Sequence, residues 1–363
     1  MKKCFFIPLM VALAISLCFG GPVPASASEQ KTWTIKVHYE QPNTAPLPVY
    51  GFHPWAKAVE EATNGRVKAQ FYPGDTLFKT RTDAVEGIKA GLADVAFMYA
   101  FAYDPQFDLI DVLTVPFFAP NGEVGSRVGW ALYEKFPEIR AQWKDVKLIT
   151  LWTTDPYIII TTKKQIKTLE DFKGMKMRVT GPMATEMMKR LGGVPMAIPM
   201  PENYINLQKG VIDGMATNGE ATAGFRLYEV IKYMTIVPTS AACLQLIMHR
   251  PTWESFPPDI QKAIMSVSGE NGGIRMGGRC FDGAYDILDK KIKESGRKIV
   301  KYTPPKEEVD RWVEIAGKPV WDIWVKKMEK RGHKNAREIL DEAIRLVEKY
   351  SQGKTDTWRD LFK

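Results

Sequence analysis

The chain has 363 residues, 25% of them charged and 45% hydrophobic, and its 50 Lys and Arg against 42 Asp and Glu give a formal net charge of +8. This length is ample for one large or two medium α/β domains. The basic residues are spread along the chain and form no patch interleaved with aromatic residues. Composition therefore disfavours a nucleic-acid-binding protein and suits an anionic small molecule as partner.

Residues 1–27 have the pattern of a secretory signal peptide. Two lysines give a positive start, residues 5–19 are apolar, and small residues ending at Ala27 form a cleavage site. A retained membrane anchor is the weaker interpretation, because the apolar run is short and contains Pro8. We therefore expect cleavage after about Ala27 and export to the periplasm.

The cysteines limit what holds the mature protein together. Cleavage would remove two lysines and two of the four cysteines, lowering the formal charge from +8 to +6 and leaving Cys243 and Cys280. Of the cysteines removed, Cys18 follows Leu17, where a lipoprotein signal needs a small residue. Two cysteines in a chain of this length cannot form the disulfide framework of a small secreted domain. A single bridge and two buried thiols both remain open.

The first half of the mature sequence alternates strands and helices. Alternating apolar and polar residues indicate the strands, and apolar residues on one face with Pro or Gly at the ends indicate the helices. We expect strands at 31–40, 66–72, 94–99 and 146–153, and helices at 48–62, 80–90 and 122–143. This order is typical of an α/β fold with parallel strands.

The chain is expected to pass from a first domain to a second after residue 153. An Asp-Pro pair separates the strand at 146–153 from an apolar strand at 157–162. Strands at 233–240 and 244–249 would return the chain to the first domain. In a protein that closes over a ligand, such crossings absorb the rotation.

The stretch 168–218 reads strand, helix, strand, helix, strand. A run of strand formers contains Arg178, and Gly-Pro at 181–182 ends it and starts a helix. The remaining expected elements are a helix to 191, a strand at 194–198, a helix at 201–211 and a strand end with a small-residue loop at 212–218. Parallel strands of this kind place ligands at their carboxyl ends.

Arg178 is the residue of this stretch that needs a chemical explanation. A guanidinium between apolar neighbours is costly to desolvate without an anionic partner. One explanation is an internal carboxylate or a path to solvent. The other is a ligand carboxylate, held through two parallel hydrogen bonds from the planar guanidinium.

From residue 257 the sequence becomes strongly helical. Residues 259–295 fit one long helix, although five glycines weaken it by about 1 kcal/mol each. Either a break near 272–278 or close packing of the glycines is expected. A short strand at 297–302 precedes two amphipathic helices, at 305–331 and 335–350, whose tryptophans are expected in the core.

Several stretches resemble the solute-binding proteins of tripartite ATP-independent periplasmic (TRAP) transporters, the DctP-like family. They are GMKMRV around Arg178, MPENYINLQKGVIDG at 200–214 and, in the amino-terminal half, EEATNGRVKAQFYPGDTLF, GIKAGLADVAF and DVLTVPFF. The likeness covers nearly all of the mature chain up to about residue 300. The resemblance implies that Arg178 clamps the carboxylate of a small organic anion. It also implies that the protein delivers this solute to TRAP membrane subunits.

The expected fold is α/β, with two domains arranged as in type II-like periplasmic binding proteins, a cleft between the lobes and C-terminal helices. We assign lobe I to residues 28–155, with part of 240–300 returning to it, and lobe II to 156–239. Residues 240–363 supply the return crossing, the long helix and C-terminal helices packing across both lobes. Monomer and homodimer remain open.

Motifs of catalysis are missing from the sequence. It contains no GxSxG, HExxH or Walker A motif, no GxGxxG leading into a helix, and no metal-ligand spacing among its four histidines. We therefore expect a binding protein without enzyme activity or cofactor. No residue is assigned as a metal ligand, and the sequence leaves open whether a metal assists binding. The alternatives are a binding protein of an ATP-driven importer, an exported hydrolase, and a sensor or adhesion module.

Ligand-binding residues are expected at the carboxyl ends of the strands, in the cleft between the lobes. This rule and the family pattern select His38, Phe78, Tyr99, Trp152, Tyr157, Arg178, Met200, Thr217 and Asn218. The family pattern usually reads Asp-Gly-Gln-Glu-Asn in the last loop, with the asparagine touching the solute, whereas this chain has DGMATN. Either Thr217 or Asn218 therefore fills that role.

A second departure from the family pattern narrows the solute. Some members carry another arginine twenty residues before the first, and Ile158 occupies that position here, beside Tyr157. One cation among apolar and aromatic walls favours a monoanion with an apolar or aromatic body, because a sugar acid would need more polar partners. Carboxylate and sulfonate both remain open.

Overall fold

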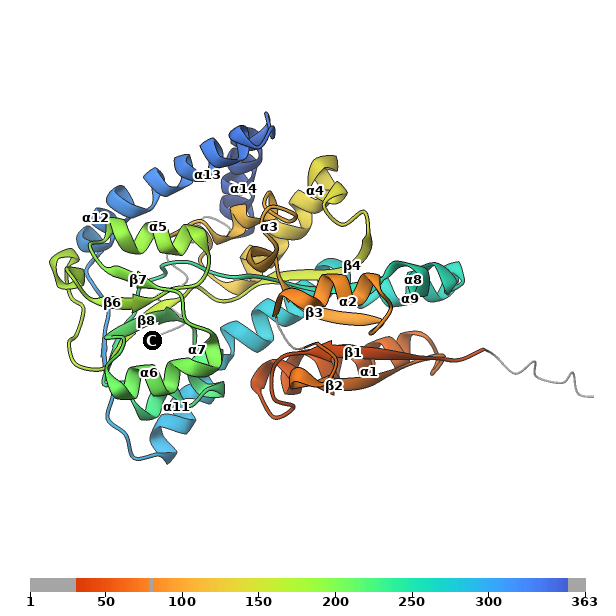
Figure 1. The fold of residues 1–363 in the computed structure, drawn as a ribbon, viewed down its shortest axis with the longest axis horizontal. Coiled ribbons are helices and arrows are strands. Elements are labelled where there is room, and N and C mark those ends of the chain that lie inside the picture. Colours follow the sequence, from red (N-terminus) through yellow and green to blue (C-terminus); the bar gives the residue numbers. More distant parts are fainter. Residues whose placement is uncertain (1–30, 79–80, 352–363) are drawn as a thin grey trace, which may run out of the picture. The chain divides into compact units, whose positions relative to one another are not determined.

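The computed structural model describes residues 31–78 and 81–351, so the expected signal peptide lies outside the described residues. From Thr32 onward the chain is one compact unit that contains two β-sheets, called sheet A and sheet B below (Figure 1). The mixed α/β architecture agrees with the fold class expected from the sequence. The exact lobe boundaries stay a prediction.

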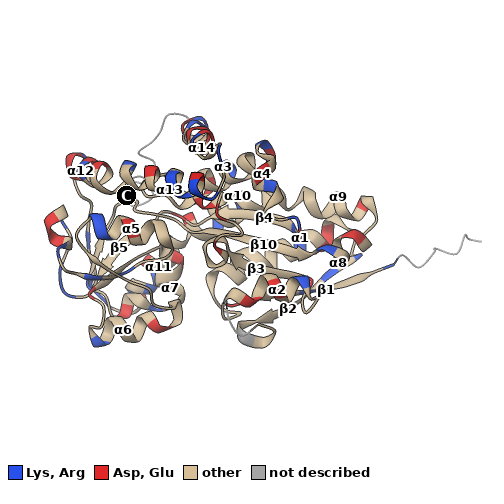
Figure 2. Cartoon of the chain, turned by 45° about the horizontal axis from the view of Figure 1, so that its top comes forward, with Lys and Arg blue, Asp and Glu red and all other residues tan. Residues whose placement is uncertain are grey.

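Sheet A contains five strands in the order β2-β1-β3-β10-β4. Strand β1 is parallel to β2 and β3, and β10 lies antiparallel between β3 and β4. The strands are β1 Trp33–Tyr39, β2 Val67–Pro73, β3 Val95–Tyr99, β4 Val146–Thr153 and β10 Cys243–His249. Since β10 is reversed, it begins at the edge where β1, β3 and β4 end. Strands β3 and β10 contain no charged Lys, Arg, Asp or Glu and are tan in Figure 2, as expected for strands buried on both faces.

Sheet B contains six strands in the order β11-β9-β5-β8-β6-β7. Strand β6 is parallel to β7 and β8, whereas β5 is antiparallel to β8 and β9. The strands are β5 Ile158–Thr161, β6 Lys176–Arg178, β7 Val194–Met196, β8 Gly214–Thr217, β9 Tyr233–Thr235 and β11 Val300–Tyr302. The parallel βαβ arrangement predicted for 168–218 is confirmed. Strands β6 and β8 end, and β5 begins, at one edge.

Helices pack on both sheets. Those before the return to sheet A are α1 His53–Ala62, α2 Ala84–Lys89, α3 Gly122–Lys135, α4 Pro137–Ala141, α5 Pro182–Arg190, α6 Asn203–Lys209 and α7 Gly219–Gly224. Those after it are α8 Arg250–Ser255, α9 Pro258–Ser266, α10 Gly269–Ile274, α11 Ala284–Glu294, α12 Lys306–Ala316, α13 Lys318–Lys330 and α14 Ala336–Ser351. Helix α10 packs on α3 and β4, α11 packs on α7, and α14 packs on α3, while α12 and α13 pack on α5. The C-terminal helices therefore contact elements that belong to both sheets.

Three segments connect the sheets, and two of them, between β4 and β5 and between β9 and β10, are hydrogen-bonded to each other. Between β4 and β5, the Thr154 N–H donates to the Ala242 carbonyl at 3.0 Å and the Tyr157 N–H donates to the Ser240 carbonyl at 2.6 Å. The Ala242 N–H donates in turn to the Thr154 hydroxyl at 3.1 Å. Asp155, between them, is fully buried. The crossing is thus a paired, buried double linker.

Three helices expected to be continuous are divided. Pro137 lacks an N–H and starts α4 after α3 has ended, and Gly317, with φ −91° and ψ −88°, separates α12 from α13. Residues 259–295 form three α-helices and the π-helix Arg275–Asp282. The break expected near 272–278 takes the form of this π-helix, whereas the earlier break, at 267–268, was not predicted.

Close backbone approach accounts for glycines in this helical segment. A Cβ built on Gly273 would lie 2.4 Å from the Leu151 carbonyl oxygen of β4. A Cβ on Gly277 would lie 2.4 Å from Ser126 Oγ and 2.5 Å from the Gly122 carbonyl oxygen of α3. These distances are too short for any side chain, so only glycine allows the helices to pack at this distance.

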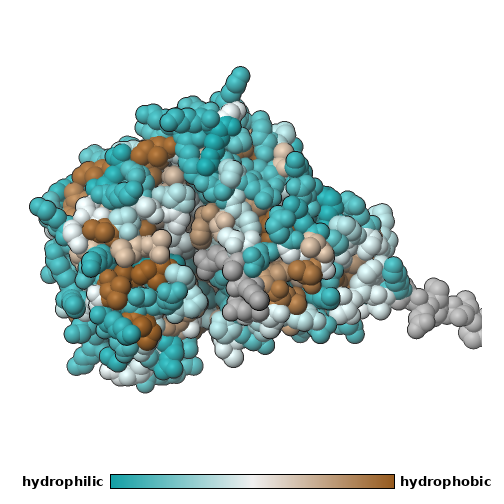
Figure 3. Space-filling view, in the orientation of Figure 1, coloured by the Kyte–Doolittle hydropathy of each residue, from teal (hydrophilic) through white to brown (hydrophobic). Residues whose placement is uncertain are grey.

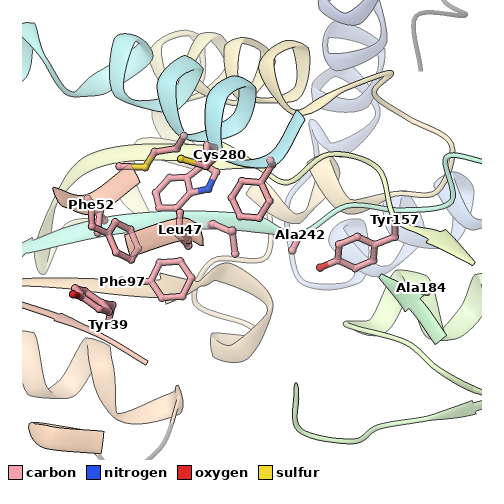
Figure 4. Close-up of a cluster of buried hydrophobic side chains, with 14 of the residues drawn as sticks. Tyr39, Leu47, Phe52, Phe97, Tyr157, Ala184, Ala242 and Cys280 are labelled. Atoms are coloured by element: carbon pink, nitrogen blue, oxygen red, sulfur yellow. The ribbon is translucent and has the colours of Figure 1, made fainter. Parts of the chain in front are cut away.

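The two cysteines of the described chain are buried and free. Burial raises the pKa of the Cys280 thiol to about 12 and raises the pKa of Cys243 strongly as well. Figure 4 shows Cys280 near the apolar side chains of Leu47, Phe52 and Phe97. Of the two possibilities left by the sequence, the single bridge is therefore wrong and the two buried thiols are confirmed.

The outer surface is largely hydrophilic. Figure 3 shows apolar residues on one face in separate groups among hydrophilic ones, and the large apolar side chains that are exposed include Val194, Ile205 and Val211. Within residues 31–78 and 81–351, no helix has both the length and the apolar composition needed to cross a membrane.

Candidate functional site

A cavity with an empty volume of about 510 Å³, partly open to solvent, lies between the edges of sheets A and B described above. It is lined by Gln41, Leu47, Tyr99, Thr154, Tyr157, Arg178, Thr180, Met200, Thr217, Asn218, Glu220, Ala221, Phe225, Leu244 and Phe281.

On the sheet A side, the lining residues come from the ends of neighbouring strands. Tyr99 is the last residue of β3, and Leu244 pairs with it near the start of antiparallel β10. Gln41 follows β1 by two residues, and Thr154 directly follows β4. The carboxyl-end rule therefore holds for this sheet.

On the sheet B side, three strands meet at the cavity in the same way. Arg178 is the last residue of β6 and Thr217 the last of β8, which runs parallel to it. Strand β5 runs the other way, and its first residue, Ile158, pairs with Thr217, so Tyr157 reaches the same edge. Two parallel strand ends and one reversed strand start thus bring these side chains together.

Arg178 is buried at the cavity wall, with 5% of its surface exposed. Its Nε donates a hydrogen bond to the Ile198 carbonyl at 3.1 Å, which fixes the plane of the guanidinium. Among the described residues that line the cavity, Arg178 is the only basic one and Glu220 the only acidic one. Arg178 is thus the cationic group that a bound anion would meet.

Asn218 and Thr217 lie side by side at the end of β8, and both line the cavity. The Asn218 side-chain oxygen accepts a hydrogen bond from the Ala221 N–H at 2.9 Å and so caps α7. Because the oxygen of the amide is committed to the cap, its NH₂ group is the part of the side chain left to donate to a solute. The Thr217 hydroxyl remains the other candidate donor.

Glu220 is an acidic residue buried in the cavity wall, with 7% of its surface exposed. Its Oε1 accepts a hydrogen bond from the Leu47 N–H at 3.3 Å. Burial raises the pKa of this carboxyl to about 7, and the hydrogen bond from Leu47 opposes the shift. The group therefore carries a proton in much of the population at mildly acidic to neutral pH.

Aromatic side chains form much of the remaining wall. They come from four separate segments of the described chain and are Tyr99, Tyr157, Phe225 and Phe281. The Tyr99 hydroxyl donates to Glu40 Oε1 at 2.7 Å, which fixes the ring at the end of β3. Leu47, Met200 and Leu244 add aliphatic surface. The cavity wall is therefore mixed, with eight aromatic or aliphatic residues beside seven polar or charged ones.

Six of the nine residues selected from the sequence line this cavity, namely Tyr99, Tyr157, Arg178, Met200, Thr217 and Asn218. Their contact with a solute stays a prediction. The position of the other three does not support such a contact. Trp152 is completely buried between Phe52 and Phe97, with ring centroids 6.3 and 6.0 Å away, and His38 stacks edge-on against Phe78 at 4.3 Å in the core of sheet A.

Other lining residues were missed by the sequence analysis. Gln41, Thr154, Thr180 and Glu220 lie within three residues of a strand end, so extending the carboxyl-end rule slightly further would have found them. Phe281 belongs to the π-helix, and no local pattern indicates that this helix reaches the cavity. Within the part of the chain that the structure describes, no cluster of three or more His, Cys, Asp and Glu residues is placed to hold a metal ion.

Comparison with known proteins identifies relatives of this chain. Residues 42–328 match the family DctP, described as bacterial extracellular solute-binding protein, family 7. A solute-binding protein of Albidiferax ferrireducens is 26% identical over 284 residues, which cover 76% of this chain and 80% of the relative. The 2,3-diketo-L-gulonate-binding periplasmic protein YiaO of Escherichia coli is 22% identical over 280 residues, which cover 74% and 80% of the two chains.

Solved structures give the same assignment. A TRAP solute-binding protein from Rhodoferax ferrireducens, crystallised with copurified benzoate, is 26% identical with a TM-score of 0.82, and the match covers 88% of this chain and 99% of that one. A marine metagenome TRAP solute-binding protein in complex with 3-hydroxybenzoate has a TM-score of 0.81 at 24% identity over the same shares. A protein from Roseobacter denitrificans with bound β-D-glucuronate has a TM-score of 0.70 at 17% identity and covers 86% of this chain and 99% of that one.

Proposed function

The chain belongs to the family 7 bacterial extracellular solute-binding proteins, the DctP family of TRAP transporters, and from this we propose that its cavity captures a small monocarboxylate with an aromatic body. The observation that carries the proposal is the combination of one buried cation, Arg178, with a wall of four aromatic side chains. The first selects for an anion, and the second selects for the kind of body attached to it.

Arg178 is suited to hold a carboxylate. Its planar guanidinium donates through parallel N–H groups that match the two oxygens of a carboxylate, and such charge-assisted hydrogen bonds are stronger than neutral ones. Burial raises their strength further, because the surroundings screen charge less than water does. The Asn218 amide or the Thr217 hydroxyl would complete the hydrogen bonds to the same carboxylate.

The aromatic side chains in the wall favour an aromatic acid over a uronic acid. A uronate would place several ring hydroxyls against Tyr99, Tyr157, Phe225 and Phe281, and each hydroxyl left without a hydrogen bond would cost about 1–3 kcal/mol. An aromatic ring instead gains from burial and from edge or offset stacking on these side chains. The structurally similar proteins bind either class, so the wall composition is what supports the aromatic choice.

The family relationship supports the rest of the proposal. Members of the family are binding proteins that work with TRAP membrane subunits, and we propose that this chain acts in the periplasm, without turnover, and passes its solute to such subunits. Closure of the two sheets around the solute would exclude water and favour the loaded form, because the bound state makes contacts that the open state lacks.

A thermal-shift screen of the mature protein tests this proposal. The panel contains benzoate, hydroxybenzoates, phenylacetate, benzenesulfonate, short keto acids, C4-dicarboxylates and glucuronate, with benzamide as the neutral counterpart of benzoate. A ligand at 100 times its Kd adds about 2.7 kcal/mol of stability. We expect the aromatic monocarboxylates to give the largest shifts and benzamide to give none. Larger shifts with glucuronate or a dicarboxylate would overturn the aromatic assignment, and no shift with any anion would overturn solute capture.

A further inference from the structure

Some polar groups of the cavity are not used by a carboxylate held at Arg178. The side chain of Gln41 is buried, with 6% of its surface exposed, and it lines the cavity. Its Oε1 has no hydrogen-bond partner among the described residues. An unsatisfied buried amide oxygen is costly, so its presence in a ligand cavity points to a donor on the ligand.

Glu220 is the second such group. The Leu47 N–H is the hydrogen-bond donor that the structure gives to this carboxyl, and it occupies Oε1 alone. The carboxyl oxygen Oε2 is then the one that carries the proton when the group is neutral, and Glu220 lines the cavity. A protonated carboxyl in a buried wall is a hydrogen-bond donor and an acceptor at the same time.

Gln41 lies on the sheet A side of the cavity, and Glu220 is hydrogen-bonded to that side. Gln41 follows β1 of sheet A, whereas Arg178 ends β6 of sheet B. Glu220 belongs to α7, but its bond to Leu47 N–H ties it to the segment that follows Gln41. Helix α7 also packs closely on this segment, since a Cβ on Gly224 would lie 3.4 Å from a side-chain carbon of Pro46.

We infer that Gln41 and Glu220 recognise a hydroxyl group carried by the body of the solute, remote from the carboxylate that Arg178 holds. This inference rests on the proposed function, because it takes the Arg178 end of the cavity as the carboxylate site. A hydroxyl donates one hydrogen bond and accepts others, so it can donate to Gln41 Oε1 and accept from the Glu220 carboxyl. An aromatic ring with a single hydroxyl satisfies both groups and still packs on the aromatic side chains of the wall. The solute class is therefore a hydroxylated aromatic monocarboxylate.

Calorimetry with matched ligands tests the inference. Kd is measured at pH 6 for benzoate and for 2-, 3- and 4-hydroxybenzoate, which share the carboxylate and the ring and differ in the hydroxyl. We expect at least one isomer to bind the wild-type protein at least about tenfold more tightly than benzoate, the size of one to two buried hydrogen bonds. If benzoate binds as tightly as every isomer, the inference is overturned while the proposed function stands.

Variants assign the preference to the two residues. Gln41→Leu and Glu220→Leu are each expected to bring the ratio of Kd values, benzoate over the preferred isomer, close to one. Glu220→Gln keeps a donor and an acceptor, so it should preserve most of this ratio. The control is Gln70→Leu, on an exposed position of β2, where the ratio should not change. A ratio that survives in both leucine variants would overturn the assignment. Melting temperatures without ligand confirm that each variant is folded, and absence of binding by all four acids would instead count against the proposed function.

Discussion

Arg178 is a buried cation at a strand end, and the proposed function gives it a specific task. Replacing it by alanine removes the partner of the solute carboxylate and leaves that charge desolvated, so Arg178→Ala should weaken binding by about 2–4 kcal/mol, or roughly 30- to 1,000-fold in Kd. The affinity of Arg178→Lys should lie between those of the wild-type protein and Arg178→Ala, because an ammonium keeps the charge but lacks the planar pair of donors. Calorimetry with the best aromatic acid measures both effects.

The matched control for this prediction is Arg190→Ala. Arg190 lies on α5, where it pairs with Glu186 at 3.2 Å on the surface, and it does not line the cavity. Its loss should leave Kd unchanged, since exposed ion pairs contribute little. An Arg178→Ala protein that binds as tightly as Arg190→Ala would contradict the carboxylate role of Arg178.

Glu220 should make stability depend on pH. Burial raises its pKa to about 7 in the folded protein, whereas an unfolded glutamate titrates near its ordinary value of 4.5. Between these values the folded state holds more protons than the unfolded state, so stability is highest below about 4.5 and falls as pH rises through about 7. Asp111 and Asp282, whose pKa values burial raises to about 8 and about 7, act in the same direction.

Glu220→Gln removes this contribution and keeps an oxygen for the Leu47 N–H. Relative to the wild-type protein, the variant should gain up to about 3 kcal/mol of unfolding free energy between pH 5 and pH 8. Urea denaturation of both proteins at four pH values measures the difference. Glu314→Gln, at an exposed position of α12, serves as the comparison and should show no such gain. Parallel pH profiles for wild type and Glu220→Gln would show that Glu220 titrates normally.

Among the elements, α7 links a helix cap to the site. Asn218 uses its side-chain oxygen to cap the helix and presents its NH₂ group to the cavity. Asn218→Asp keeps an oxygen for the cap but puts a negative charge beside the solute carboxylate. The variant should therefore keep its ligand-free melting temperature while its affinity falls at least about tenfold, through loss of a charge-assisted hydrogen bond and added repulsion.

Two further variants separate the roles at this strand end. Asn218→Ala should lose affinity and also about 1 kcal/mol of stability, because the cap is gone. Thr217→Val removes the hydroxyl without touching the cap. If Thr217→Val abolishes binding and Asn218→Asp does not weaken it, the hydroxyl and not the amide is the donor to the solute.

The π-helix Arg275–Asp282 offers a test of close packing. A Cβ on Gly277 would lie 2.4 Å from Ser126 Oγ, whereas a Cβ on the neighbouring Gly278 would meet Glu123 Cβ at an ordinary 3.6 Å. Gly277→Ala should therefore destabilise the protein by about 1–3 kcal/mol, since α3 must move. Gly278→Ala should be neutral or stabilising by up to about 1 kcal/mol, because alanine favours helix. Equal urea midpoints for the two variants would contradict the close-contact explanation.

The helices and strands also show which elements could be predicted from the sequence. Alternation and turn residues located β4 at 146–153 without error, and Gly-Pro at 181–182 correctly ended β6 and began α5. Local sequence patterns did not predict features that depend on packing between elements. Residues 305–331 keep one amphipathic period across Gly317, yet the chain breaks there into α12 and α13. The aromatic residue Phe281 reaches the cavity only because the π-helix packs against α3 and the segment before α1.

For the whole molecule, the site depends on two sheets, each built from strands that come from separate parts of the sequence. Residues of the cavity come from both sheets. Two of the crossings between the sheets are the paired segments around Thr154 and Ala242, and a third runs through residues 250–299. The carboxyl-end rule predicted that strand ends of both sheets would meet at the ligand site. Six of the nine residues selected with this rule and the family pattern line the cavity. It could not tell Trp152, which neighbouring aromatic rings cover, from Tyr157, which lines the cavity.

A cavity shared by two sheets predicts a change of compactness on binding. The solute would contact Arg178 on the sheet B side and Gln41 on the sheet A side, so both sets of contacts form only when the sheets are close together. The paired segments around Thr154 and Ala242 are short, and rotation about them would bring the sheets together or apart. Small-angle X-ray scattering should therefore show a smaller radius of gyration with saturating aromatic acid than without it.

Arg178→Ala at the same ligand concentration should keep the ligand-free radius of gyration, which separates closure from a general effect of the acid. If the wild-type protein binds by calorimetry but its radius of gyration does not change, capture occurs in a preformed site without closure, because a ligand shifts a conformational equilibrium only by as much as it prefers one state over the other.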